Sequence, residues 1–137
     1  MCVMAVDGYR WVEHTAELEL EIFARSEEAV FAQALRAFAE LVGDGHLGPP
    51  ASRAVEIDGE DRAVLLARWL DELEFIAETE DLVPDGIEQL TLGDRGLRAT
   101  VRCHTGRPHN VIKGATYHRL AFHHHPDGYR ATVILDV

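Results

Sequence analysis

Residues 17–24 alternate between acidic or aromatic and aliphatic side chains, and this alternation constrains the fold more than any other feature. A period of two is typical of a strand with one buried face. The core face is therefore expected to carry the even-numbered aliphatic residues, which are Leu18, Leu20, Ile22 and Ala24. Glu17, Glu19 and Glu21 share the opposite face, and for Glu19 and Glu21 we expect contact with solvent.

Two later segments repeat their apolar residues at helical spacing. The first helix is expected to begin after Ser26, a favourable N-cap, and to end at Gly43. The second is expected to begin near Asp61. Their expected buried residues are Phe31, Ala34, Leu35, Phe38 and Val42 in the first helix, and Leu65, Leu66, Trp69, Leu70, Leu73 and Ile76 in the second.

Acidic residues crowd the end of the second helix, where basic residues would suit the helix dipole. They are Glu72, Glu74, Glu78, Glu80 and Asp81. A solvated acidic face is the ordinary interpretation, and a docking surface for a basic partner is the alternative.

The remaining segments predict strands, separated by loops and turns rich in glycine and proline. They are Tyr9–Glu13, Ala54–Asp58, Ile87–Leu92, Leu97–His104, Tyr117–His125 and Tyr129–Val137. A chain of 137 residues is the size of one domain. The order of elements therefore predicts a single α+β domain over residues 1–137, with two helices packed on one or more mainly antiparallel sheets.

The formal net charge of −11 disfavours direct, tight binding to nucleic acid, because it repels phosphate backbones. A basic protein partner is easier to accommodate, although acidity alone also serves solubility. No apolar run is long enough to cross a membrane, and the first residues lack the basic start of a secretory signal. We therefore expect a cytoplasmic protein in which Cys2 and Cys103 stay reduced.

The run His123-His124-His125 resembles a metal site, but strand alternation sends His124 to the opposite face from its neighbours. We expect a solvated hairpin tip there in preference to a transition-metal site. No phosphate-binding glycine loop, nucleophile elbow or HExxH motif occurs, which disfavours catalysis by this chain alone.

Carboxylates near the two ends of the chain predict a cation site. Asp136 lies beside the α-carboxylate of Val137, and Glu17 would add a third hard oxygen ligand for a divalent cation. From spacing alone, a polar strand end that limits aggregation is the preferred explanation of Asp136. Further candidate functional residues are His14, Lys113 and His118, for which a surface lysine and strand-edge histidines are the ordinary alternative.

Four segments together resemble the archease family. They are Trp11–Glu17, Trp69–Leu73, Ile112–His118 and Ile134–Val137, in matching order and spacing from Tyr9 to the last residue. The resemblance implies a non-catalytic protein cofactor of the GTP-dependent tRNA-splicing RNA ligase, which joins 2′,3′-cyclic phosphate or 3′-phosphate ends to 5′-hydroxyl ends. Such a cofactor promotes guanylylation of the ligase and its multiple turnover.

The resemblance also implies a divalent cation, calcium above all, held by Glu17, Asp136 and Val137. The family usually has aspartate at the position of Glu17, and calcium tolerates the longer side chain better than magnesium, which has a tighter octahedral shell. Magnesium and manganese are the alternative cations. Gly114 also replaces a usual alanine. The alternatives are an acidic binding module or chaperone-like protein outside the ligase chemistry, and a small metal-dependent hydrolase.

Overall fold

The computed structural model describes residues 7–43, 45, 48–109 and 112–137, which form two antiparallel sheets and two helices. Sheet A has the strand order β1-β2-β7-β6, and sheet B has the order β3-β5-β4. Sheet A consists of β1 (Gly8–His14), β2 (Glu17–Ala24), β7 (Gly128–Asp136) and β6 (Gly114–His125). Sheet B consists of β3 (Pro50–Asp58), β5 (Gly96–Thr105) and β4 (Leu82–Gly93). The predicted α+β fold, with helices packed on antiparallel sheets, is confirmed.

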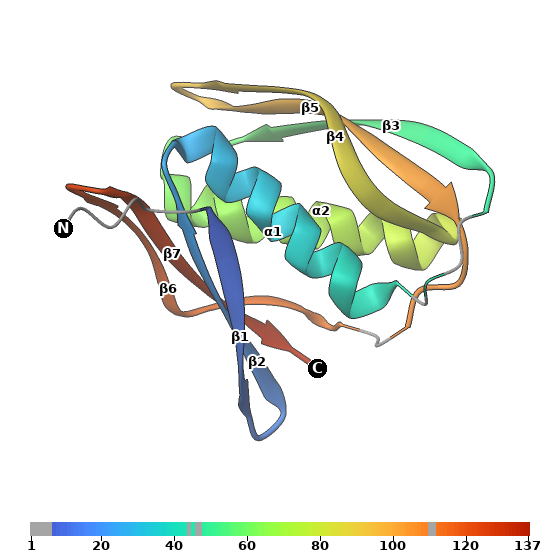
Figure 1. The fold of residues 1–137 in the computed structure, drawn as a ribbon, viewed down its shortest axis with the longest axis horizontal. Coiled ribbons are helices and arrows are strands. Elements are labelled where there is room, and N and C mark those ends of the chain that lie inside the picture. The colour runs from blue at the N-terminus through green and yellow to red at the C-terminus, as the bar shows by residue number, and fades with distance from the viewer. Residues whose placement is uncertain (1–6, 44, 46–47, 110–111) are drawn as a thin grey trace, which may run out of the picture.

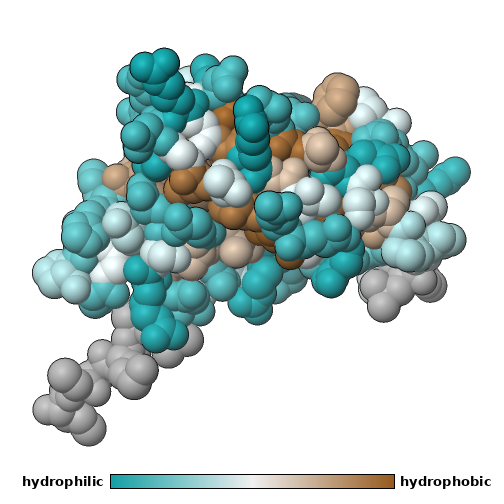
Figure 2. Space-filling view, turned by 90° about the horizontal axis from the view of Figure 1, so that it is seen from above, coloured by the Kyte–Doolittle hydropathy of each residue, from teal (hydrophilic) through white to brown (hydrophobic). Residues whose placement is uncertain are grey.

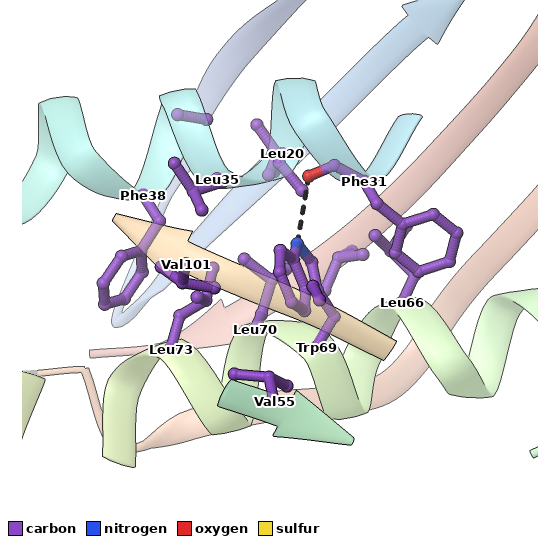
Figure 3. Close-up of a cluster of buried hydrophobic side chains, with 14 of the residues drawn as sticks. Leu20, Phe31, Leu35, Phe38, Val55, Leu66, Trp69, Leu70, Leu73 and Val101 are labelled. Atoms are coloured by element: carbon purple, nitrogen blue, oxygen red, sulfur yellow. Dashed lines mark hydrogen bonds between the residues drawn. The ribbon is translucent and has the colours of Figure 1, made fainter. Parts of the chain in front are cut away.

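The two helices, α1 (Glu27–Val42) and α2 (Arg62–Glu80), contact each other and lie between the two sheets (Figure 1). Their apolar faces meet the inner faces of both sheets in one hydrophobic core. Trp69 of α2 is fully buried there, and its indole N–H donates a 3.0 Å hydrogen bond to the carbonyl oxygen of Phe31 in α1 (Figure 3). The predicted buried stripes of both helices are confirmed.

Both helices begin where the sequence predicts. The Ser26 hydroxyl accepts a 3.1 Å hydrogen bond from the backbone N–H of Ala29, and the Asp61 carboxylate accepts one of 2.8 Å from that of Ala63. These bonds satisfy donors that have no partner inside the helix. Gly43 follows α1 as predicted, and its φ of −75° is within reach of any residue.

Three strands begin at least about three residues earlier than the sequence patterns predicted. β3 begins at Pro50, β4 at Leu82 and β6 at Gly114. Proline is tolerated at the first residue of a strand and at bulges, and β4 has a register shift beside Pro84. Proline and glycine therefore marked these segments as loops in the sequence although they pair as strands.

The face of the molecule on the side of sheet B carries a band of hydrophobic residues surrounded by hydrophilic ones (Figure 2). No helix among the described residues is long and apolar enough to cross a membrane.

Cys103 is buried and free, and burial raises the pKa of its thiol to about 11. Cys2 lies outside the described residues.

At the acidic end of α2, Glu78, Glu80 and Asp81 are exposed as the ordinary interpretation predicts, whereas Glu72 and Glu74 are half-buried. Glu80 accepts a 2.8 Å hydrogen bond from Arg53 of β3. Glu74 is half-buried, and burial, followed by repulsion from Glu78 and Asp71, raises its pKa from 4.5 to about 7. The protein therefore keeps a carboxyl group in a place that disfavours its charge.

Replacing Glu74 with glutamine should stabilise the protein above neutral pH. A carboxyl whose pKa is higher in the folded than in the unfolded chain costs stability as the pH rises from about 4.5 to about 7. Allowing for solvent screening, we expect a gain of about 1–2 kcal/mol at pH 8 and little change at pH 4. Urea unfolding at both pH values measures it, with Glu60→Gln as a control at an exposed acid. If Glu74→Gln increased the free energy of unfolding equally at both pH values, the raised pKa of Glu74 would not be the cause.

Candidate functional site

Glu17 and Asp136 lie directly opposite each other on the neighbouring strands β2 and β7. His14 of β1 is the partner of Glu17 on its other side, so the three residues form one row across sheet A. Directly opposed residues of antiparallel strands point to the same face. That face is the outer one, because the neighbouring Leu18 and Leu135 pack toward the helices. We call Glu17 and Asp136 the carboxylate pair.

Main-chain hydrogen bonds bring the other predicted residues to the same end of the sheet. The turn between β1 and β2 holds Ala16 at a φ of 60°, and the Val137 N–H donates a 3.3 Å bond to the Ala16 carbonyl. The Lys113 N–H donates a 2.7 Å bond to the Asp136 carbonyl. The C-terminus accordingly lies near the β1–β2 hairpin in Figure 1. Residues far apart in the sequence thus gather at one exposed corner.

The predicted supporting residues differ in their surroundings. The Lys113 side chain is exposed beside the carboxylate pair. His118 is also exposed, in a stretch of β6 that is out of register with β7. Its backbone N–H donates a 3.3 Å hydrogen bond to the Thr116 hydroxyl. Both side chains are therefore open to solvent, and of the two only Lys113 is connected to this corner by a main-chain hydrogen bond.

Glu19 is buried, so the expectation that it faces solvent is wrong. It lies on the predicted outer face, but Arg119 and His14 cover its side chain, which is 12% exposed. An Arg119 guanidinium nitrogen lies 3.1 Å from a Glu19 carboxylate oxygen, and His14 Nε2 lies 3.5 Å from the same oxygen. Glu21 is half-buried and forms an ion pair with Arg10. The sequence pattern gave the face and missed these partners.

The donor chemistry of the carboxylate pair fits a divalent cation. Two carboxylates directly opposite each other on a sheet repel each other. A divalent cation bound by their oxygens relieves that repulsion. Among the described residues, no three His, Cys, Asp or Glu side chains are arranged to hold a metal ion. The main chain reaches this corner at Val137.

A cavity of about 640 Å³ opens beside the carboxylate pair, between the β1–β2 hairpin and the end of α1. Its apolar lining comes from Trp11, Leu18, Leu41 and Val137, and its acidic lining from Glu13, Glu17 and Glu40. Apolar walls with acidic groups suit a segment that carries both an apolar and a basic side chain. The corner therefore offers a contact surface next to its carboxylates.

Sequence reasoning missed a second polar cluster, on sheet B. The Asp85 carboxylate lies 2.7 Å from Nδ1 of the buried His104 and accepts a 2.9 Å hydrogen bond from Arg102. Burial raises the pKa of Asp85, but the bonds from Arg102 and His104 outweigh it, so that pKa lies below its ordinary value. Asp85 has no partner in the strand register, because β4 is irregular between Pro84 and Gly86. No sequence period predicts such a contact.

The histidine run lies at the tip of the β6–β7 hairpin, as predicted. His123, His124 and His125 pair with three successive residues of β7, so His124 points to the opposite face from the other two. The His124 ring lies 4.8 Å from that of Tyr129. The prediction that strand alternation separates these rings is confirmed.

Comparison with known proteins gives the same family along nearly the whole chain. Residues 9–137 match the Archease protein family (MTH1598/TM1083). Protein archease of Archaeoglobus fulgidus is 29% identical over 136 residues, covering 94% of this chain and 98% of its own. Protein archease of Methanothermobacter thermautotrophicus is 31% identical over 140 residues, covering 95% and 99%.

Solved structures agree with the sequence comparison. The solution structure of protein 1598 of Methanobacterium thermoautotrophicum has a TM-score of 0.74 at 30% identity, covering 95% of this chain and 99% of that one. The crystal structure of an archease, "possible chaperone", of Thermotoga maritima has a TM-score of 0.68 at 23% identity, covering 92% and 94%, and shows the likeness of fold alone. This chain belongs to the archease family.

Proposed function

We propose that this protein is a non-catalytic cofactor of a GTP-dependent tRNA-splicing RNA ligase and promotes guanylylation of that enzyme. The observation that carries the proposal is the carboxylate pair at an exposed corner of a chain that matches the archease family over residues 9–137. The formal net charge of −11 favours a basic protein partner over direct contact with RNA. The ligase is therefore the molecule that this corner contacts.

Glu17, Asp136 and the α-carboxylate of Val137 would hold a divalent cation. The first two present their oxygens from rigid neighbouring strands, and the bond from Val137 to Ala16 anchors the third beside them. When bound, such a cation supplies positive charge that offsets phosphate charge during nucleotidyl transfer. Calcium suits the longer Glu17 side chain better than magnesium, because its shell accepts variable geometry.

The other residues of the corner position it against the ligase. The exposed Lys113 offers an ammonium group to a phosphate, and the exposed His118 offers a ring nitrogen. The cavity lined by Trp11 and Leu18 receives an apolar side chain of the partner. None of these groups has to form or break a covalent bond, so the protein assists a reaction that the ligase carries out.

Guanylylation of the cognate ligase tests the proposal. Under multiple turnover with GTP and calcium, the wild-type protein should increase guanylylated ligase at least about tenfold, and Asp136→Asn should remove most of this stimulation, because it takes one charge from the carboxylate pair. Asp127→Asn is the matched control, since it makes the same change at the other end of β7 and should stimulate like wild type. No stimulation by the wild type would reject the proposal.

A second function, an acidic binding module, is favoured by one observation, the apolar and acidic cavity beside the carboxylate pair. The Thermotoga maritima relative is described as a "possible chaperone". In that case Asp136→Asn should stimulate the ligase as well as wild type does, while Trp11→Ala should stimulate less. Asp136→Asn thus separates the functions, because Trp11→Ala should weaken stimulation in either case.

A further inference from the structure

Arg119 reaches across a strand to contact two carboxylates of β2. Its guanidinium nitrogens lie 3.1 Å from a Glu19 oxygen and 3.9 Å from a Glu17 oxygen. Arg119 belongs to β6, and β7 lies between β6 and β2 in sheet A. Its side chain therefore passes over β7, where Ile134 pairs with Glu19 and is fully buried although it belongs to the outer face.

Arg119 lies in an irregular part of β6. Thr116 pairs with Ile134 and Ala121 pairs with Thr132, so the four residues 117–120 stand opposite the single residue Val133. The surplus chain forms a bulge, and bulges re-aim side chains. Arg119 lies within it, and its guanidinium group contacts Glu17 and Glu19 of β2.

The backbone of Arg119 adopts an unfavourable conformation. Its φ is 54°, in the left-handed region that favours glycine and asparagine. A residue stays in such a conformation when its surroundings determine its position. The contacts with Glu19 and Glu17 are the interactions of this side chain that offset the strain.

The two carboxylates near Arg119 differ in their exposure to solvent and in their distance from the guanidinium group. The Glu19 side chain is 12% exposed and lies close to both Arg119 and His14. The Glu17 side chain is 34% exposed and has only the longer contact with Arg119 among the ion pairs of the described residues. A guanidinium group can bridge two carboxylates through separate N–H groups. The ion pair of Arg119 with Glu19 is therefore the stronger one, and its ion pair with Glu17 is the weaker one.

We propose that Arg119 is an internal counter-ion of the carboxylate pair, which competes with a divalent cation for Glu17. This inference rests on the cation site of the proposed function. Without a cation, Arg119 offsets the charge that Glu17 and Asp136 bring together. With a cation, Glu17 turns to it, and Arg119 stays on Glu19. Arg119 thereby sets the cation concentration at which the corner becomes loaded.

Calcium titration of four variants at physiological ionic strength tests the competition. Arg119→Gln removes the charge and should bind calcium roughly tenfold more tightly than wild type. Arg119→Gly removes the same charge and also suits the positive φ, so it should show the same gain even if the glutamine variant folds poorly. Arg119→Lys keeps the charge and should stay within about threefold of wild type.

The matched control is Arg130→Gln, on the outer face of β7 at its far end. Arg130 stands six residues from Asp136, about 20 Å along the strand, which exceeds the screening length at physiological ionic strength. Its replacement changes the net charge equally and should alter calcium affinity by less than about twofold. If Arg130→Gln increased calcium affinity as much as Arg119→Gln does, net charge alone would explain the effect, and the proposal would be overturned.

A second readout, thermal unfolding, does not need the ligase. In the presence of a chelator, Arg119→Gln should unfold at a lower temperature than wild type, and added calcium should narrow the difference. Weaker or unchanged calcium binding by Arg119→Gln and Arg119→Gly would overturn the proposal and leave the cation site standing. If wild type and every variant fail to bind calcium, the cation site and the competition are both rejected.

Discussion

Replacing Trp69 with alanine should lower the free energy of unfolding by about 3–5 kcal/mol. Trp69 is fully buried, its ring meets that of Phe31 edge to face at 6.4 Å, and its N–H bonds to the Phe31 carbonyl. The change leaves a cavity in the layer that joins α1 to α2 (Figure 3). Such a loss is a large share of the stability of an ordinary domain.

Urea unfolding measures this effect, with Phe75→Ala as the matched control. Phe75 belongs to the same helix and is 58% exposed, so its truncation should change the stability by less than about 1 kcal/mol. Trp69→Phe keeps a ring and loses the hydrogen bond, so its loss of unfolding free energy should lie between those of the two alanine variants. If Trp69→Ala and Phe75→Ala lower the free energy of unfolding equally, Trp69 does not join the helices as described.

Calcium at a hundred times its dissociation constant should stabilise the wild-type protein by about 2.7 kcal/mol, which raises its unfolding temperature by on the order of 10 °C. The reason is that the carboxylate pair exists only when β2 and β7 are paired. A ligand that binds the folded state alone stabilises it by mass action. Differential scanning calorimetry with calcium and with a chelator measures the shift.

Asp136→Asn should show almost none of this shift, because it removes one of the charges that we propose hold the cation. With the chelator it should be as stable as wild type or slightly more so, since it also relieves the repulsion from Glu17. Asp127→Asn should respond to calcium like wild type. An equal calcium shift in all three proteins would place the cation elsewhere.

Local patterns in the sequence predicted most elements of the fold. Leu20 and Ile22 are buried where a period of two places them, and Phe31 and Trp69 are buried where a helical period does. These patterns work because one face of each element meets the core along its whole length. The start of β4 escaped prediction, because Pro84 reads as a loop residue and is accommodated at an irregular edge strand.

The candidate site was predictable only in part. The positions of Glu17 and Asp136 followed from motifs, but their pairing depends on strand order, which no local period encodes. Arg119 contacts Glu19 from within a bulge, and Asp85 contacts His104 beside a second irregularity. Departures from regular pairing thus carry the polar contacts that a periodic interpretation of sequence misses.

The pairing of β2 with β7 also bears on when the corner can form. β2 lies near the start of the described chain and β7 at its end, so their contact closes a loop of nearly the full length. Contacts between residues so distant in sequence carry a high entropic cost and form slowly. Neither a β1–β2 hairpin nor a β6–β7 hairpin folded alone would bring Glu17 to Asp136. The carboxylate pair is consequently a mark of completed folding, and a partner that recognises it selects finished molecules.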